Sequence, residues 1–152
     1  MTVVFQRLDN TGLIFGKRLV TGAASIQPGL LCKFASSGET IVVATASDQP
    51  AGMAYGARTR EYRPTTKVFD SGDEGALLQG SVLALLSVDF FSSGSLPSAA
   101  DALYAANSGQ IATTGTKKVG YCIRQETTYL GTAGTGTSQA LALCRFNFDA
   151  LT

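Results

Sequence analysis

The chain has 152 residues, 45% of them hydrophobic and 15% charged, and its 12 basic and 11 acidic side chains leave a formal net charge of +1. This length suffices for one domain with its own core, and the balanced charge lacks the basic face that phosphate-driven nucleic-acid binding needs. A charged fraction below the roughly 25% typical of soluble domains predicts much neutral surface, which favours an oligomer or a larger assembly over a monomer.

Histidine is absent from the sequence, which removes the usual general base, a common metal ligand and the Ser-His catalytic pairs. A carboxylate pair could come from the acidic cluster of Asp70, Asp73 and Glu74. The Ser and Gly residues within this cluster are instead typical of an exposed turn, and its spacing does not match a calcium loop. We therefore expect a protein that is not an enzyme and that has no metal and no cofactor.

The three cysteines, Cys32, Cys122 and Cys144, are widely spaced, odd in number and each placed in an apolar stretch. This pattern predicts small buried hydrophobic side chains and not a disulfide framework or a metal site. The first residues lack the basic and apolar regions of a secretion signal, and no apolar run is long enough to span a membrane. We therefore expect synthesis in a reducing cytosol, or in something assembled there.

Short strand patterns separated by turns run through the chain, and helix patterns are weak. Residues 1–20 hold two alternating pieces, Val3 to Leu8 and Leu13 to Leu19, with a break at residues 9–12. This segment is predicted to form either an extra hairpin of the same domain or an arm that orders on a partner. The remaining residues, 21–152, are predicted to form the main domain.

The middle of the chain predicts further strands. The runs Leu30 to Ala35 and Thr40 to Thr45 flank a Ser-Ser-Gly sequence and predict a hairpin. Residues 75–89 are strongly apolar but are interrupted at Gly80, so they predict a strand pair or one bent strand and not a helix. Residues 98–101 predict a short helix or a turn.

Two strands are predicted in the last third of the chain. Lys117 to Gln125 alternates, with the odd-numbered residues 119–123 on one face. In Gln139 to Phe148 the leucines occupy odd-numbered positions and the phenylalanines even-numbered ones, so a regular strand would place them on opposite faces. This predicts either a bulge near Arg145 or burial of both faces. Many short strands with regular turns predict an all-β fold, either a barrel or a sandwich.

Segments 27–53 and 96–121 share an order of sequence features: a proline, a strand, a Ser-Gly turn, a second strand and a strand led by glycine. The shared order predicts two similar hairpin units in a small barrel. Chance similarity in a chain rich in glycine, alanine and threonine is the alternative explanation.

A basic stretch with Arg58, Arg60 and Arg63 precedes the acidic residues Asp73 and Glu74. Such a bipolar segment predicts pairing across subunits or onto another surface. The alternative is an exposed loop whose charges pair locally and contribute little. Nucleic-acid binding is the weakest interpretation, because few aromatic residues accompany the basic ones.

Residues 43–54, 74–82 and above all 96–114, followed by Val119 to Ile123, carry a pattern of turns and strands. It consists of a strand ending in a Ser-Gly turn, a threonine-rich return strand and a Val-Gly entry to the next strand. Over residues 27–124, about two-thirds of the chain, this pattern resembles the small β-barrel decoration (cement) proteins of tailed phages. The resemblance implies a β-tulip-like barrel on the outside of an icosahedral head.

The resemblance also implies partners. They are the major capsid protein, whose neighbouring subunits the protein would clamp, and further copies of the chain in a homotrimer, with no nucleic acid and no membrane. The protein would be made in the host cytoplasm and end on the outer capsid surface of the virion. An N-terminal arm could add a strand to a capsid edge. The candidate contact residues for the capsid or for other subunits are Val3, Phe5, Leu8, Phe15, Arg58, Arg60, Arg63, Asp73 and Glu74.

Two other functions fit the same composition. One is a different phage structural subunit, in the tail tube, the connector or the fibre base. The other is a ligand-binding β-barrel, for which the absence of tryptophan is unfavourable.

Overall fold

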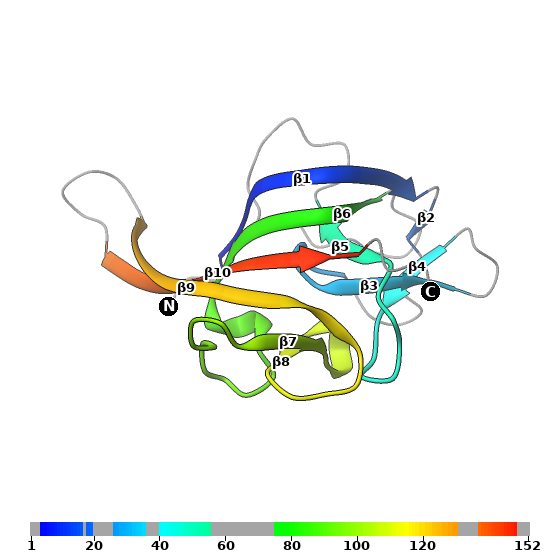
Figure 1. The fold of residues 1–152 in the computed structure, drawn as a ribbon. Coiled ribbons are helices and arrows are strands. Elements are labelled where there is room, and N and C mark those ends of the chain that lie inside the picture. Colours follow the sequence, from blue (N-terminus) through cyan, green and yellow to red (C-terminus); the bar gives the residue numbers. More distant parts are fainter. Residues whose placement is uncertain are drawn as a thin grey trace.

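The computed structural model describes residues 4–16, 18–19, 26–35, 40–55, 75–130 and 137–148. Over these residues the protein is all-β, with ten strands in one sheet and two short 3-10 helices, which confirms the predicted fold class (Figure 1). No helix in this described part is long and apolar enough to cross a membrane. The elements in chain order are β1 (Phe5–Gly16), β2 (Arg18–Leu19), β3 (Leu31–Phe34), β4 (Thr40–Val43), β5 (Gly52–Tyr55), β6 (Gly75–Leu86), η1 (Val88–Phe90), β7 (Ala102–Ala105), η2 (Asn107–Gly109), β8 (Ile111–Ala112), β9 (Lys118–Leu130) and β10 (Thr137–Asn147).

β6 joins the two parts of the sheet. β1 pairs antiparallel along its whole length, whereas β5 pairs with residues 76–78 and β10 with residues 81–86. The change of partner lies at Gly80, whose φ of 69° is a conformation that glycine adopts without strain. The Gly80 carbonyl accepts a hydrogen bond of 2.9 Å from the Phe148 N–H. Beyond β5 the sheet continues through β3, β4 and β2, and beyond β10 through β9, β7 and β8.

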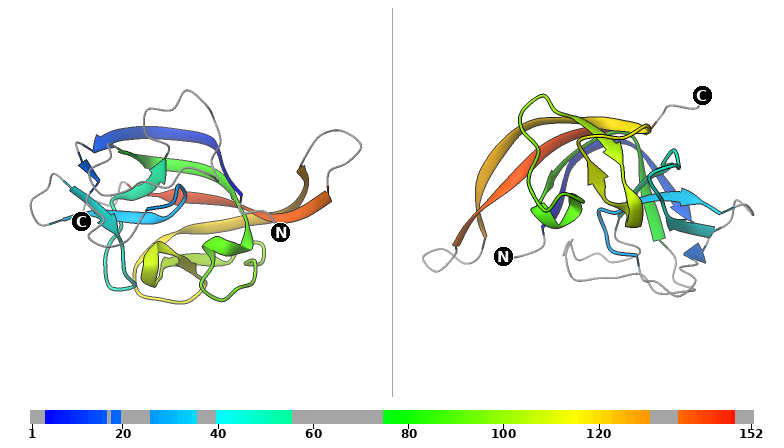
Figure 2. Two further views of the ribbon diagram at one scale, coloured as in Figure 1. Left: turned by 180° about the vertical axis from the view of Figure 1, so that it is seen from behind. Right: turned by 90° about the horizontal axis from the view of Figure 1, so that it is seen from below.

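The two parts of the sheet curl toward each other into a half-barrel, which is clearest in the view from below (Figure 2). They meet where the Gly109 N–H donates to the Ala44 carbonyl at 2.9 Å and the Ala46 N–H donates to Asn107 Oδ1 at 3.0 Å. Gly109 has a φ of 71°, and a Cβ at this position would lie 2.9 Å from the Leu31 carbonyl oxygen. The contact between the two parts therefore requires glycine.

The main hydrophobic core lies between the two parts of the sheet, because both contribute to it. Phe5 of β1, Phe90 of η1 and Phe146 of β10 are among its largest fully buried side chains. The rings of Phe5 and Phe90 are tilted, with centroids 6.3 Å apart. A smaller cluster contains Ile26, Cys32, Ile41, Ala54 and Leu77.

β10 is buried on both faces, as one of the two sequence alternatives predicted. Phe146 and Phe148 face the main core. Leu141 and Leu143, on the opposite face of the strand, pack with Val4 and Leu85 in a third cluster. The associated bulge is not at Arg145, because the register shift lies in the pairing with β9, where Ile123 is the extra residue. The leucines and phenylalanines of β10 therefore lie on two buried faces of one strand, whose pairing with β6 is unbroken.

Two details of the strand predictions are wrong. β9 does not keep its predicted alternation: Val119 is buried in the core, whereas Tyr121 is 46% exposed. The register between β9 and β7 shifts at this point and leaves Val119 without a partner on β7. After this extra residue, each following side chain points to the face opposite the one predicted. No turn forms at residues 9–12, since β1 continues through them and absorbs the irregularity as two register shifts against β6.

The predictions for three other segments are confirmed. β3 and β4 are antiparallel partners, β6 is one strand, and residues 98–101 form a turn in which the Asp101 N–H donates to the Ser98 carbonyl at 3.1 Å. β1 lies in the sheet, so residues 5–16 do not form a hairpin of their own. The division of the chain at residue 20 stays a prediction, because residues 20–25 lie outside the described residues.

The two segments with similar sequence order also have the same topology. In the first, β3 lies between β4 and β5, and β5 pairs with β6. In the second, β7 lies between β8 and β9, and β9 pairs with β10. All of these pairs are antiparallel, so the shared order of turns and strands corresponds to two units of one architecture.

Candidate functional site

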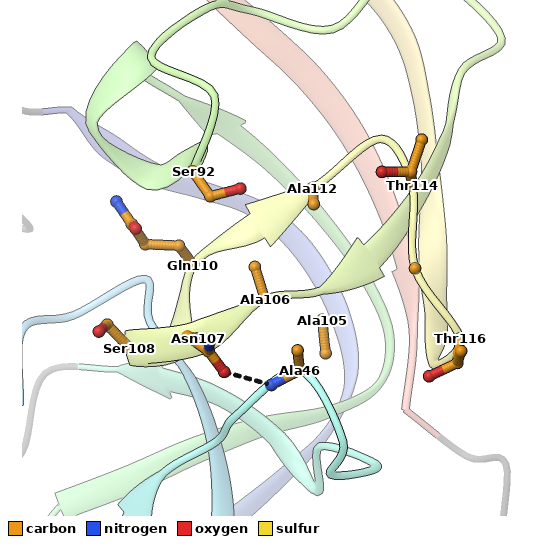
Figure 3. A pocket seen from close by; sticks show the side chains of 11 residues that line it. Ala46, Ser92, Ala105, Ala106, Asn107, Ser108, Gln110, Ala112, Thr114 and Thr116 are labelled. Atoms are coloured by element: carbon orange, nitrogen blue, oxygen red, sulfur yellow. Dashed lines mark hydrogen bonds between the residues drawn. The ribbon is translucent and has the colours of Figure 1, made fainter.

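A surface pocket of about 450 Å³ lies beside the contact between the two units (Figure 3). The end of β7, the η2 turn, β8 and the turn before β9 form most of it, and the loop after β4 and the residue Ser92 complete it. Its lining residues are Ala46, Ser92, Ala105, Ala106, Asn107, Ser108, Gln110, Ala112, Thr114, Gly115 and Thr116.

The lining is neutral and small. Four of the eleven lining residues are alanine, and the others are glycine or carry hydroxyl or amide groups; none is ionisable. Such a pocket can donate and accept neutral hydrogen bonds, as in contacts with a peptide backbone or with hydroxyl groups. Its own side chains supply no charged group for acid–base chemistry and no thiolate.

The pocket has a fixed shape because its polar residues are held by the fold. Asn107 accepts from the Ala46 N–H, and Gln110 Nε2 donates to the Asp89 carbonyl at 3.0 Å. Ser108 has a φ of 61°, an uncommon conformation for a residue with a Cβ. The η2 turn therefore places its side chains in a defined geometry.

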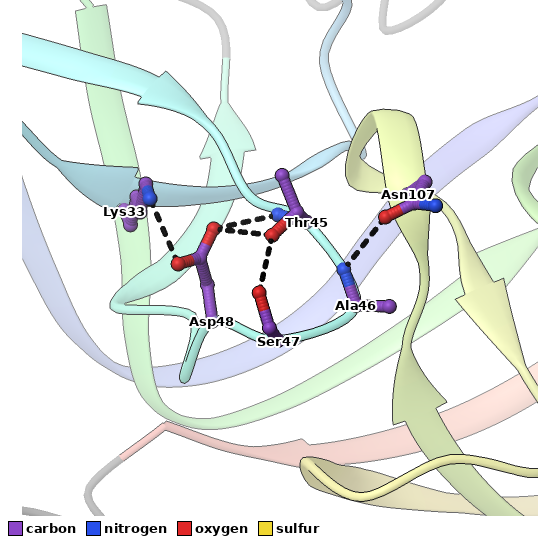
Figure 4. A network of polar contacts seen from close by, with 6 residues as sticks. All are labelled: Lys33, Thr45, Ala46, Ser47, Asp48 and Asn107. Carbon is purple, nitrogen blue, oxygen red and sulfur yellow. Dashed lines mark hydrogen bonds and ion pairs between the residues drawn. The ribbon is translucent and has the colours of Figure 1, made fainter.

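Next to the pocket, a polar network fixes the loop after β4 (Figure 4). Asp48 Oδ2 accepts from the N–H and from the hydroxyl of Thr45, both at 2.8 Å, and Asp48 Oδ1 forms an ion pair of 2.8 Å with Lys33. The hydrogen bond from Lys33 and that from the Thr45 N–H lower the pKa of the Asp48 carboxyl. Since Ala46 belongs to the same loop, this network positions one wall of the pocket.

Two large hydrophobic side chains are exposed in the described part of the chain. Leu8 is 45% exposed and Tyr121 is 46% exposed. Leu8 is the residue left unpaired by the first register shift between β1 and β6. Each side chain is held on a paired strand, so each presents apolar area from a rigid support.

Among the candidate contact residues, only Leu8 is described and exposed. Phe5 is fully buried and packs in the core, so its side chain does not present a contact surface in the folded chain. Phe15 lies in β1 opposite Ala76, and its contact role stays a prediction. The remaining candidates lie outside the described residues: Val3, Arg58, Arg60, Arg63, Asp73 and Glu74.

Neither the pocket nor the exposure of Tyr121 was predicted from the sequence. The sequence Ser108-Gly109 predicted a turn. A turn pattern is local, however, so it does not indicate which distant segment the turn packs against. Tyr121 was assigned to the same face as Val119. The one local signal of the bulge that separates them is Gly120, because glycine within a strand often marks a bulge. Among the described residues, no three His, Cys, Asp or Glu side chains cluster as they would around a metal ion.

The fold and the site define a small antiparallel half-barrel with a neutral pocket and two rigidly held apolar side chains. Comparison of the chain with protein-family models and with curated proteins finds no match.

Proposed function

We propose that this protein is a structural virion subunit that binds the outer surface of a phage capsid and stabilises the shell by clamping neighbouring major-capsid subunits. The observation that carries the proposal is the resemblance of residues 27–124 to the β-barrel decoration proteins of tailed phages. The curled, all-β sheet supports it, because it is the kind of fold that the resemblance implies.

The chemistry of the surface also supports this proposal. A decoration subunit needs a rigid shape and complementary surfaces. The low charge of the chain and the neutral pocket are compatible with contacts made by packing and by neutral hydrogen bonds. Each contact can be modest, because many copies on one shell act together. We further propose that the subunit acts as a homotrimer.

The exposed Leu8 and Tyr121 are the described side chains best suited to such contacts. Apolar and aromatic side chains that become buried at an interface contribute most of its free energy, whereas polar residues at the rim contribute little. Leu8 is also close in sequence to Phe5, whose burial anchors the start of β1 in the core.

The direct test is cosedimentation of the purified full-length chain with phage capsids that lack their decoration subunit. The expected result is saturable binding to the capsids, together with a trimer in size-exclusion chromatography with light scattering. A chain that neither binds capsids nor forms a small closed oligomer would contradict the proposal. A polymer or a hexameric ring would favour a tail, connector or fibre-base subunit instead.

The contact role of Leu8 is tested by Leu8→Ser in the same assay, with Thr113→Ser as a matched control at another exposed position. We expect Leu8→Ser to weaken capsid binding at least about tenfold, the loss typical of an important interface residue. The thermal midpoint should change little in both variants, since neither removes a buried side chain. Unchanged capsid binding by Leu8→Ser would remove this residue from the interface.

A ligand-binding β-barrel is the second candidate, and the neutral pocket beside η2 favours it. Its hydroxyl and amide groups would suit a small polyhydroxy compound, although aromatic residues, which usually line such pockets, are absent from its lining. A thermal-shift screen with mono- and oligosaccharides tests this candidate. A ligand that stabilises the wild-type chain but not Gln110→Ala would support it.

A further inference from the structure

β9 and β10 place two of the three cysteines directly opposite each other. Cys122 is the register partner of Cys144 in the antiparallel pairing of these strands. Both side chains are fully buried in the main core, and both are free thiols. The sequence spacing of 22 positions gave no indication of this contact.

The backbone hydrogen bonds define the kind of pair that the two cysteines form. The Cys122 N–H donates to the Asp101 carbonyl at 2.9 Å, and the Cys122 carbonyl accepts from the Ala100 N–H at 2.8 Å. In a strand, the N–H and the carbonyl of one residue point to the same edge, so both groups of Cys122 point away from β10. Cys122 and Cys144 are therefore a non-hydrogen-bonded pair.

This kind of pair has the spacing that a disulfide needs. In non-hydrogen-bonded antiparallel pairs the Cα atoms lie roughly 4.5 Å apart and the side chains are closest. Disulfides join Cα atoms roughly 4.4–6.8 Å apart. Both side chains are buried in the same core cluster, so they lie on the same face of the sheet. The Cys122 thiol donates to the Pro97 carbonyl at 3.8 Å.

We propose that Cys122 and Cys144 are a modification site, at which a small disulfide such as oxidised glutathione converts the two thiols into a cross-strand disulfide between β9 and β10. In the first step the thiolate of one of the two cysteines attacks one sulfur of the small disulfide, forms a mixed disulfide and releases one small thiolate. In the second step the thiolate of the other cysteine attacks the protein sulfur of the mixed disulfide and releases the second small thiolate. The protein loses two electrons to the small disulfide, and the two thiol protons end on the two released thiols.

Burial raises the pKa of both thiols, so neither forms a thiolate readily in the closed fold. The reaction therefore occurs during folding or during local opening, when a small disulfide can reach the sulfurs.

The pairing is specific, because the third cysteine lies elsewhere. Cys32 is on β3, in the smaller cluster with Ile41 and Leu77, and burial raises the pKa of its thiol to about 12. Along the sheet, β5 and β6 separate β3 from β10. The folded chain therefore favours one of the three possible disulfides.

The experiment refolds the full chain from denaturant in a mixture of oxidised and reduced glutathione and blocks the remaining thiols with an alkylating agent. Trypsin then separates the cysteines onto peptides 19–33, 119–124 and 125–145, because cleavage follows Lys or Arg at positions 18, 33, 118, 124 and 145. Mass spectrometry without reduction identifies the linked pair. A parallel sample of folded chain, treated with oxidised glutathione, tests the reaction after folding.

We expect peptides 119–124 and 125–145 to be linked in the refolded protein, and its thermal midpoint to exceed that of the reduced protein by roughly 5–10 °C. Cys32→Ser should keep the link and the increase, whereas Cys122→Ser and Cys144→Ser should each lose both. The proposal is overturned if the refolded native chain keeps both thiols free. It is overturned equally if links to peptide 19–33 are as abundant as the expected one.

Discussion

Asp48 shows how one half-buried carboxylate organises a loop. It binds Lys33 of β3 and the N–H and hydroxyl of Thr45, so it connects the loop to the sheet. Because these partners favour the charged form, the pKa of Asp48 is lower in the folded chain than the ordinary value of 3.8. A carboxyl with a lowered folded-state pKa stabilises the fold above its unfolded-state pKa and loses this contribution as the pH falls through the folded-state value.

The first prediction follows from this sign. At neutral pH, Asp48→Asn should lower the free energy of unfolding by on the order of 0.5–1 kcal/mol, since the ion pair is partly exposed and therefore partly screened. Below pH 3.8 the difference between wild type and variant should shrink, because the wild-type carboxyl also becomes neutral. Urea denaturation at pH 7 and at pH 2.5 measures it. An equal difference at both pH values would assign the effect to packing and not to charge.

The second prediction concerns Gly109, where the two parts of the sheet meet. Gly109 and Gly94 both have a φ of 71°, but an added Cβ would meet Val43 and Leu31 only at Gly109, and nothing within 4 Å at Gly94. Gly94→Ala should therefore cost about 1–2 kcal/mol of backbone strain alone. Gly109→Ala should cost about 1–3 kcal/mol more, because the Leu31 carbonyl belongs to a paired strand and cannot move freely.

Chemical denaturation of the two glycine variants under one set of conditions measures this difference. Hydrogen exchange at Ala46 and at Gly109 provides a second readout, since both N–H groups donate across the contact. Equal destabilisation by the two variants would mean that the contact tolerates a Cβ and that its close approach does not require glycine.

At the scale of the elements, β10 is enclosed on all sides. It pairs with β6 on one edge and with β9 on the other, and side chains on both of its faces are buried. Its sequence is accordingly apolar at consecutive positions from Ala140 to Cys144. This composition is typical of central strands that are covered on both faces.

The third prediction tests the burial of the outer face of β10. Leu141 is fully buried in the cluster with Val4, Leu85 and Leu143. Leu141→Ala should therefore lower the free energy of unfolding by about 2–5 kcal/mol. The neighbouring Ala140 is exposed, and Ala140→Ser should change it by less than about 0.5 kcal/mol. A small effect of Leu141→Ala would show that this face of the sheet is open to solvent.

At the scale of the whole molecule, β6 and the main core connect the two units. β6 pairs with β5 of the first unit and with β10, which pairs in turn with β9 of the second unit. The core takes Leu31 and Met53 from the first unit and Leu103 and Ile111 from the second. Neither unit can be opened without exposing apolar side chains of the other. Such an arrangement favours a single cooperative unfolding transition.

The fourth prediction is that the two similar units unfold together. Far-ultraviolet circular dichroism and tyrosine fluorescence should give coincident transitions in urea for the full-length chain. The calorimetric and van't Hoff enthalpies should also agree. Separate transitions, or one unit that keeps protected amides while the other exchanges, would show that the units are independent domains.

The amino-acid sequence by itself determined the class of fold and most of its strands. Alternation, β-branched residues and turn signals are local properties, so they indicated β3, β4, β6, β9 and β10 without knowledge of the partners. The shared order of segments 27–53 and 96–121 also indicated two similar units, because each unit is built from the same succession of turns and strands.

Only the tertiary structure decided which strands meet and which faces they bury. The bulges at Val119 and Ile123 depend on the neighbouring strands, so the face of Tyr121 could not be read from its position. The pairing of Cys122 with Cys144 and the approach of Gly109 to Ala44 are likewise contacts between distant segments. Local sequence determines backbone conformation, whereas register and packing depend on residues far away in the chain.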